Sequence, residues 1–200
     1  THNGFVTETF LDELAAAGGK DAFEVRRELL KDHPRHLGVL ELAAEKAGWG
    51  EDLGPGRGRG IAVHESFSSF VAEVVDVTVD DEGGFSVDRV VCAVDGGIAV
   101  NPDIIEAQMQ GGIGYALSAA LREEVTLNAG EVNQRNFDSY RPLRIDEMPK
   151  IEVHIVPSAE APTGVGEPGV PPLAPALANA LAAATGKRID RLPIGDQLKA

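Results

Sequence analysis

Cysteine, basic charge and long apolar runs are all scarce in this sequence, and each scarcity excludes something. With Cys92 as its one cysteine, the chain can form no internal disulfide and no iron-sulfur or zinc site built from cysteines. Within the apolar run RVVCAV this residue is expected to be a small buried side chain. Basic residues number 18 against 32 acidic ones, and the formal net charge of -14 opposes binding to nucleic acid or to an anionic membrane.

The chain also lacks the segments that insert a protein into a membrane or address it for export. It has no run of about 18 apolar residues, the length needed to span a bilayer. The opening stretch THNGFVTETF lacks the basic and then apolar segments of a secretory signal. We therefore expect a soluble chain with no membrane insertion and no nucleic-acid partner, while the sequence does not distinguish the cytoplasm from the periplasm.

What is present is an ordinary globular composition, 43% hydrophobic and 25% charged. The first part of the chain carries apolar residues at helical spacing. Thr9 is the expected N-cap of a first helix, a capping box of Asp21 and Glu24 opens a second, and Pro34 stops it. These residues predict a helical segment over 1–50.

Strand patterns follow a glycine-rich stretch, residues 48–60, which is expected to be a linker. The GRGRG within it precedes a strand, whereas a dinucleotide-binding glycine motif follows a strand and opens a helix, so a flexible turn is favoured. Residues 69–79 and 85–95 are rich in β-branched residues and predict a hairpin. With a further strand at KIEVHIV and a helix at LAPALANALAAAT, residues 51–200 complete an α+β fold of mixed sheet and helices.

The NP dipeptide at Asn101 predicts the start of a long helix, since asparagine caps helices and proline is favoured in the first turn. Gly111 and Gly112 weaken that helix, each by about 1 kcal/mol relative to alanine. Close approach of another backbone or of a ligand is the usual reason for such glycines. Gln108 on the same helix, taken alone, is most often an ordinary helix residue.

One carboxylate, Glu167, stands among glycines and prolines in TGVGEPGVPP, a stretch with no other ionisable side chain. Taken alone, Glu167 supports structural hydrogen bonding and a general base equally. Asp95, at the end of an apolar strand, is more often a turn cap than a catalytic group. The five histidines show no ligand spacing, so no metal held by protein side chains is expected, and no serine lies in a nucleophile motif.

Three motifs in order carry a resemblance: VNP, then Q-x-x-GG, then GVGEP. The chain resembles the C-terminal part of the molybdenum-binding large subunit of the xanthine oxidase and aldehyde oxidoreductase family, and within it the isoquinoline 1-oxidoreductase β subunits. The resemblance covers essentially the whole chain. It implies part of a molybdopterin-binding domain within the α+β fold.

The resemblance also implies roles for particular residues. The glutamate of GVGEP is the family's catalytic base beside molybdenum, which corresponds to Glu167. The glutamine of the glycine-rich helix touches the molybdopterin cofactor, which corresponds to Gln108, with Gly111 and Gly112 keeping the helix surface low beside it. Val165 and Gly166 are then expected to border the cofactor as well. The implied reaction hydroxylates an N-heterocycle or aldehyde with water as the oxygen source.

The implied assembly extends beyond this chain. Family subunits are several times longer, and their upstream part carries most of the groups that bind the cofactor, which is expected in its cytosine dinucleotide form. Electrons would leave through 2Fe-2S clusters on a small partner subunit, since this chain has no cysteines for them. Relatives of the isoquinoline type often have cysteine where Gly96 stands. A chain without its upstream part is expected to be inactive, and a noncatalytic scaffold that retains the fold remains the alternative interpretation.

Overall fold

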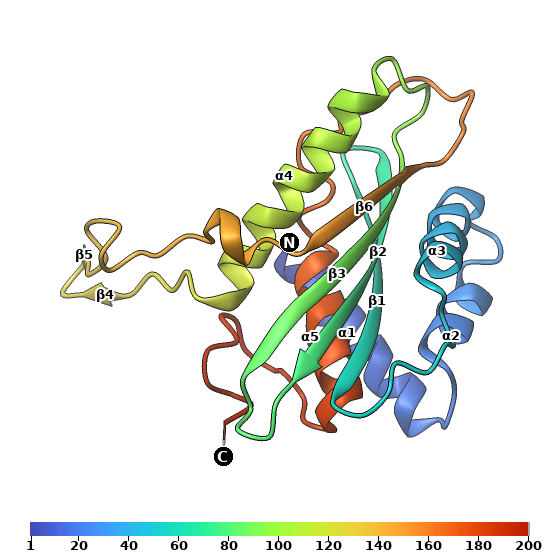
Figure 1. Ribbon diagram of the computed structural model, residues 1–200. Helices are drawn as coiled ribbons and strands as arrows, with labels where there is room; N and C mark the ends of the chain where they lie inside the picture. The colour runs from blue at the N-terminus through green and yellow to red at the C-terminus, as the bar shows by residue number, and fades with distance from the viewer. Residues whose placement is uncertain (200) are drawn as a thin grey trace.

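The computed structural model describes residues 1–199 as helices packed on both faces of one mixed sheet (Figure 1). The elements in chain order are α1 His2–Ala17, α2 Ala22–Leu29, α3 Pro34–Ala47, β1 Arg57–Ser66, β2 Ser69–Val79, β3 Phe85–Asp95, α4 Pro102–Leu121, β4 Leu127–Asn128, β5 Glu131–Val132, a 3-10 turn Ile145–Glu147, β6 Lys150–Ile155 and α5 Leu173–Thr185. The predicted α+β fold is confirmed.

The sheet has the strand order β1-β2-β3-β6. The predicted hairpin of β2 and β3 is present, β1 pairs with β2 antiparallel, and β6 pairs with β3 in parallel. Because β3 and β6 run the same way, the segments that follow them, α4 and the loop 156–172, leave the sheet at the same end. Two segments far apart in sequence therefore start side by side (Figure 1).

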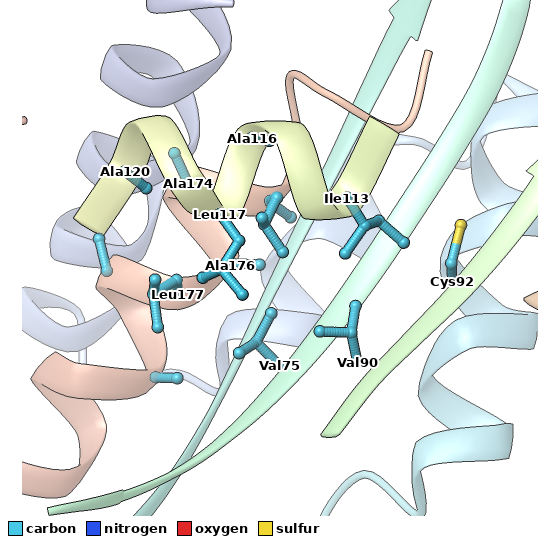
Figure 2. Close-up of a cluster of buried hydrophobic side chains, with 14 of the residues drawn as sticks. Val75, Val90, Cys92, Ile113, Ala116, Leu117, Ala120, Ala174, Ala176 and Leu177 are labelled. Carbon is cyan, nitrogen blue, oxygen red and sulfur yellow. The ribbon is translucent and has the colours of Figure 1, made fainter. Parts of the chain in front are cut away.

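The larger core lies between the sheet and the helices α4 and α5. Figure 2 shows Ile113 and Leu117 of α4 directed toward Val75 and Val90 of the sheet, with Leu177 of α5 beside them. Burying a side chain of this size contributes about 1.5–3 kcal/mol. The smaller core lies on the other face, where α3 covers β2 and β3. Both faces of β2 are thus buried, which explains its nearly continuous apolar sequence.

Two helix boundaries differ from the sequence prediction. Helix α1 begins at His2, so Thr9 lies inside it, where the hydroxyl donates to the Phe5 carbonyl at 2.7 Å instead of capping. Pro34 opens α3, because its missing N–H is harmless in a first turn, and α2 has already ended at Leu29. The cap at Asp21 is confirmed: its carboxylate accepts from the Glu24 N–H at 2.9 Å.

Four residues of the GRGRG stretch, 57–60, open strand β1 rather than forming a flexible turn. A Cβ atom placed on Gly58 or Gly60 would overlap the backbone of α5, at Ala180 and Ala176 respectively. The alternating glycines therefore let α5 lie directly on the strand, and this tertiary contact is why glycine-rich sequence becomes sheet here. Arg59, between them, pairs with Asp76 on β2 at 2.6 Å.

A buried ion pair ties the N-terminal helices to the sheet. Arg26 of α2 bonds to Glu8 of α1 at 2.8 Å and to Asp12 at 2.7 Å, and Glu8 also accepts from the Val63 N–H of β1 at 3.1 Å. Helix α1 in turn packs on α5. The division of the chain near residue 50 into two domains stays a prediction.

Candidate functional site

The loop between β6 and α5, which carries Glu167, is fastened to the end of the sheet. Ser69, the first residue of β2, has its hydroxyl 2.6 Å from that of Thr163 and donates to the Gly164 carbonyl at 2.9 Å. The Thr163 N–H donates to the carbonyl of Gly96, just after β3, at 2.9 Å. The loop is thus held by the start of β2 and by the residue that follows β3, so the sheet sets its position.

Small residues after β3 allow this close approach. A Cβ atom placed on Gly96 would lie 2.7 Å from Val165 Cγ1, so a side chain at position 96 would require Val165 to move. Gly97 has a φ of +77°, in the left-handed region that favours glycine. Val165 is half-buried against this turn. It borders a cavity of about 230 Å³ at the start of α4, lined also by Ile98 and Ile104.

Glu167 stands at a tight turn just before α5. Its carbonyl accepts from the Val170 N–H at 3.0 Å, and Pro168 and Gly169 between them are buried. The side chain of Glu167 itself is exposed, as is Gly166. The prolines and the buried glycine fix the turn, so a rigid backbone presents a carboxylate to the surface of this chain.

Helix α4 forms the other side of the site. Its cap at Asn101, whose side chain accepts from the Ile104 N–H at 3.2 Å, is as predicted. A Cβ atom placed on Gly112 would lie 3.5 Å from Val170 Cγ2 and 3.6 Å from the Gly169 carbonyl carbon. The helix and the Glu167 turn therefore lie side by side at Gly112, at distances that would still leave room for a methyl group.

Gln108 lies one helical turn before Gly112, and Gly111 directly precedes Gly112 in the helix. Gln108 is exposed, and no atom lies within 4 Å of a Cβ placed on Gly111. Gly111 borders a cavity of about 330 Å³ together with Gly114 and Tyr115. Of the six residues expected to form the site, Gly112 and Val165 pack within the chain, while Gln108, Gly111, Gly166 and Glu167 face outward.

The cavity that Gly111 borders is also lined by Ser118 and Glu123, which belong to a polar cluster that sequence reasoning missed. Tyr140 donates to Glu123 at 3.0 Å, Ser118 bonds to the same carboxylate, and the Leu143 N–H donates to the Ser118 hydroxyl at 2.7 Å. These groups are separated by up to 25 residues, so no local pattern announces them. The cluster anchors the arm of residues 122–149, which projects from the body beside α4 (Figure 1).

Asp95 is the turn cap that its position suggested. It accepts from the Gly97 N–H at 3.0 Å and forms two hydrogen bonds with Arg35 of α3, both 2.7 Å. The Arg35 hydrogen bonds hold the pKa of Asp95 below its usual range. Cys92, three residues earlier, is fully buried as expected, and burial raises the pKa of its thiol.

Glu73 is a further residue that sequence reasoning missed. It lies in the middle of β2, is 0% exposed, and neither of its oxygens has a hydrogen-bond partner within residues 1–199. A signal was present, because Glu73 continues the period-two series of Val71 and Val75 that faces α4 and α5. Burial raises its pKa well above the ordinary 4.5, because desolvation disfavours the charged carboxylate.

Metal-ligand clusters and membrane-spanning helices are both absent from the described residues. Among the described residues no three His, Cys, Asp or Glu side chains gather in a way that could bind a metal ion. None of the helices over residues 1–199 has the length and apolar character needed to cross a membrane.

Comparison with known proteins gives consistent results. The sequence profile of the molybdopterin cofactor-binding domain matches residues 39–149. The chain is 37% identical to the β subunit of isoquinoline 1-oxidoreductase from Brevundimonas diminuta over 95% of its length, and 36% identical to a nicotinate dehydrogenase subunit from Pseudomonas putida over 96%. It spans 25% and 18% of those two relatives.

Solved structures agree with the sequence comparison. The copper- and molybdenum-containing CO dehydrogenase superimposes on 64% of this chain with a TM-score of 0.57 and 26% sequence identity. The match covers 17% of that chain. In both comparisons the present chain corresponds to a minor part of a much longer protein.

Proposed function

Because the chain belongs to the molybdopterin cofactor-binding domain family of the molybdenum hydroxylases, we propose that it is the C-terminal catalytic portion of a larger hydroxylase subunit. Its relatives are molybdenum oxidoreductases. The observation that carries the proposal is the contact of Gly112 with the Glu167 turn. That contact sets an exposed carboxylate and the exposed amide of Gln108 on adjoining elements, next to open glycine surface.

The residues that face outward fit one wall of a pterin site. Gly111 and Gly166 each have open space where a Cβ would be, so a flat ring system can approach the backbone closely. Gln108 has an amide that can both donate and accept, which suits the mixed polar edge of a pterin. We assign the holding of molybdopterin to Gln108, Gly111 and Gly166, with Gly112 and Val165 supporting them from below.

Molybdopterin, when bound, supplies the two-electron oxidation, and this chain supplies the base. Glu167 accepts a proton on its carboxylate during the attack of water-derived oxygen on an electron-poor carbon of the substrate. Pro168 and the hydrogen bonds at Ser69 and Thr163 hold the loop backbone that carries that carboxylate, which lowers the ordering required at the moment of reaction. We infer that the substrate is an N-heterocycle or an aldehyde.

The remaining parts of the enzyme lie outside this chain. A pterin dinucleotide carries phosphates that need several backbone or basic donors, and a chain with net charge -14 is a poor source of them. Its one cysteine cannot hold iron-sulfur clusters. We therefore propose a cofactor in the cytosine dinucleotide form shared with the upstream remainder of the subunit, and a small partner subunit with 2Fe-2S clusters.

A scaffold that retains the fold without the chemistry is the less favoured function. A scaffold gains nothing from an exposed carboxylate on a turn stiffened by proline and anchored by Ser69. The two relatives of this chain named above are also enzyme subunits.

The test compares the chain alone with the chain joined to its upstream part and an iron-sulfur partner. Both are purified from a molybdenum-replete host, and metal content and hydroxylation of isoquinoline and benzaldehyde are measured. We expect neither molybdenum nor turnover in the chain alone, and both in the assembly. Stoichiometric molybdenum with turnover in the chain alone would contradict the proposed division of the site, and an assembly that binds molybdenum without turnover would favour the scaffold.

A further inference from the structure

A buried carboxylic acid lies directly beneath the turn that presents Glu167. Glu73 Oε1 is 3.6 Å from the position that a Cβ atom on Gly169 would occupy. That same position is 3.4 Å from both the carbonyl oxygen and the Sδ of Met109 on α4. Strand β2, helix α4 and the Glu167 turn therefore meet at one point, with the Glu73 carboxyl on the sheet side of it.

The surroundings of Glu73 offer no partner for a charge. In the sheet it stands between Ala62 of β1 and Cys92 of β3. Within residues 1–199, the titratable side chain paired with it in the sheet is Cys92, and burial raises the pKa of that thiol. The residues that α4 and the turn contribute, Met109 and Gly169, carry no charge. The buried residues of α5 are apolar apart from Asn179, whose amide donates to the Glu8 and Ile61 carbonyls.

An unpaired buried carboxyl is costly, so its presence requires an explanation. A leucine of similar size would fill the same volume without a polar atom to desolvate. Glu73, unlike leucine, fills the space under Gly169 with a group that can lose a proton. Ionisation would place an unpartnered charge under the turn and favour an opening that lets water reach it.

We propose that Glu73 is a positioning residue for Glu167: its neutral carboxyl supports the Pro168–Gly169 turn against Met109, and its ionisation releases the turn. The inference rests on the proposed function in so far as Glu167 is the base. Glu73 touches neither substrate nor cofactor, because the turn and α4 cover it. It acts on the reaction through the place at which Glu167 is held.

The stability of the protein gives the first test and needs no cofactor. The folded pKa of Glu73 is raised, so its contribution to stability is fully present below pH 4.5 and is lost as pH rises through the folded pKa. Glu73→Gln keeps the shape and cannot ionise, so the midpoint of urea unfolding should fall less steeply with pH than in wild type. Glu41→Gln, which removes an exposed carboxyl from α3, should retain the wild-type slope. Equal slopes in wild type and Glu73→Gln would overturn the proposal.

Turnover in the assembled enzyme gives the second test, with isoquinoline and benzaldehyde as probes. Glu73→Gln should match wild-type kcat at neutral pH and retain it at alkaline pH where wild type declines. Glu73→Leu should lower kcat on the order of ten- to a hundredfold with KM unchanged, as expected for a misplaced base. A core filler would leave the pH profile of Glu73→Gln unmoved, and that result would overturn the positioning role.

The two tests separate the inference from the function on which it rests. If Glu167→Gln keeps full turnover while Glu73→Gln flattens the pH dependence of unfolding, the base assignment fails and the buried acid beneath the turn stands. If Glu167→Gln is inactive while Glu73→Leu retains wild-type kcat and pH profile, Glu167 is the base and Glu73 does not position it.

Discussion

Gly112 of α4 packs against Gly169 of the Glu167 turn, and a Cβ atom on Gly112 would lie 3.6 Å from the Gly169 carbonyl carbon. A Cβ atom at that distance would make an ordinary van der Waals contact, so the helix and the turn lie side by side with space for a methyl group between them. The side chains of Val170 and Met109 border the same contact. The elements that carry Gln108 and Glu167 are therefore direct neighbours.

Replacement of Glu167 by glutamine should remove nearly all turnover from the assembled enzyme. The amide keeps the shape of the exposed side chain but cannot accept the proton, and loss of a general base costs about a hundred- to ten-thousandfold. Molybdenum content and melting temperature should remain those of wild type. Glu160→Gln, an exposed glutamate on the same loop, is the matched control. Turnover within a few-fold of wild type would refute the assignment.

Replacement of Gln108 by alanine should weaken retention of the cofactor and leave the fold intact. The side chain is exposed on a helix whose start is fixed independently at Asn101, and alanine favours the helix. The measurement is molybdenum per protein after extensive dialysis, together with the melting temperature. Glu106→Ala truncates a neighbouring exposed side chain and should retain molybdenum. Full occupancy in Gln108→Ala would make Gln108 an ordinary helix residue.

Two glycine-to-alanine substitutions should change stability in opposite directions. Gly60→Ala places a methyl group into the α5 backbone at Ala176, so we expect a loss of about 1–3 kcal/mol as the helix is pushed off β1. Gly38→Ala lies inside α3 with no atom within 4 Å of the new Cβ, and should gain about 0.5–1 kcal/mol. Urea unfolding of both variants checks the pair. Equal effects would show that β1 tolerates side chains against α5.

Loss of the Asp95 carboxylate should destabilise the protein at neutral pH and much less in acid. A buried hydrogen bond to a charged group contributes about 1.5–3 kcal/mol, which Asp95→Asn should remove at pH 7. The folded pKa of Asp95 is lowered, so this stability is present above 3.8 and is lost as pH falls through the folded value. The difference between wild type and Asp95→Asn should therefore shrink below pH 3.8. A constant difference across pH would contradict the ion pair with Arg35.

The sequence predicted those parts of the fold that depend on local chemistry. The cap at Asp21, the cap at Asn101 and the glycine that ends α5 are decided by side chains within a turn of the backbone they satisfy. The strand formed by GRGRG was missed, because glycines there are explained only by α5, which lies more than a hundred residues further along the chain. The parallel pairing of β3 with β6 is equally non-local.

The candidate site divides in the same way. Gln108 and Glu167 were found through motifs, since each lies in a stretch of unusual composition, and their roles stay predictions. Glu73 sits in an ordinary strand sequence, and what distinguishes it, a buried carboxyl without a partner, exists only once α4 and the Glu167 turn cover the sheet. The Ser118 and Glu123 cluster likewise requires the arm to fold back onto α4.

The parallel course of β3 and β6 has a consequence for how such a protein can diversify. The chain must travel back along the sheet between them, and α4 and the arm of residues 122–149 make that return journey. The pairing of β3 with β6 fixes both ends of this connection, whereas the arm projects from the body. We therefore expect changes of length within the arm to leave the start of α4 and the Glu167 turn at the same end of the sheet. The arm is thus the part of the chain in which insertions and deletions should disturb the Glu167 turn least.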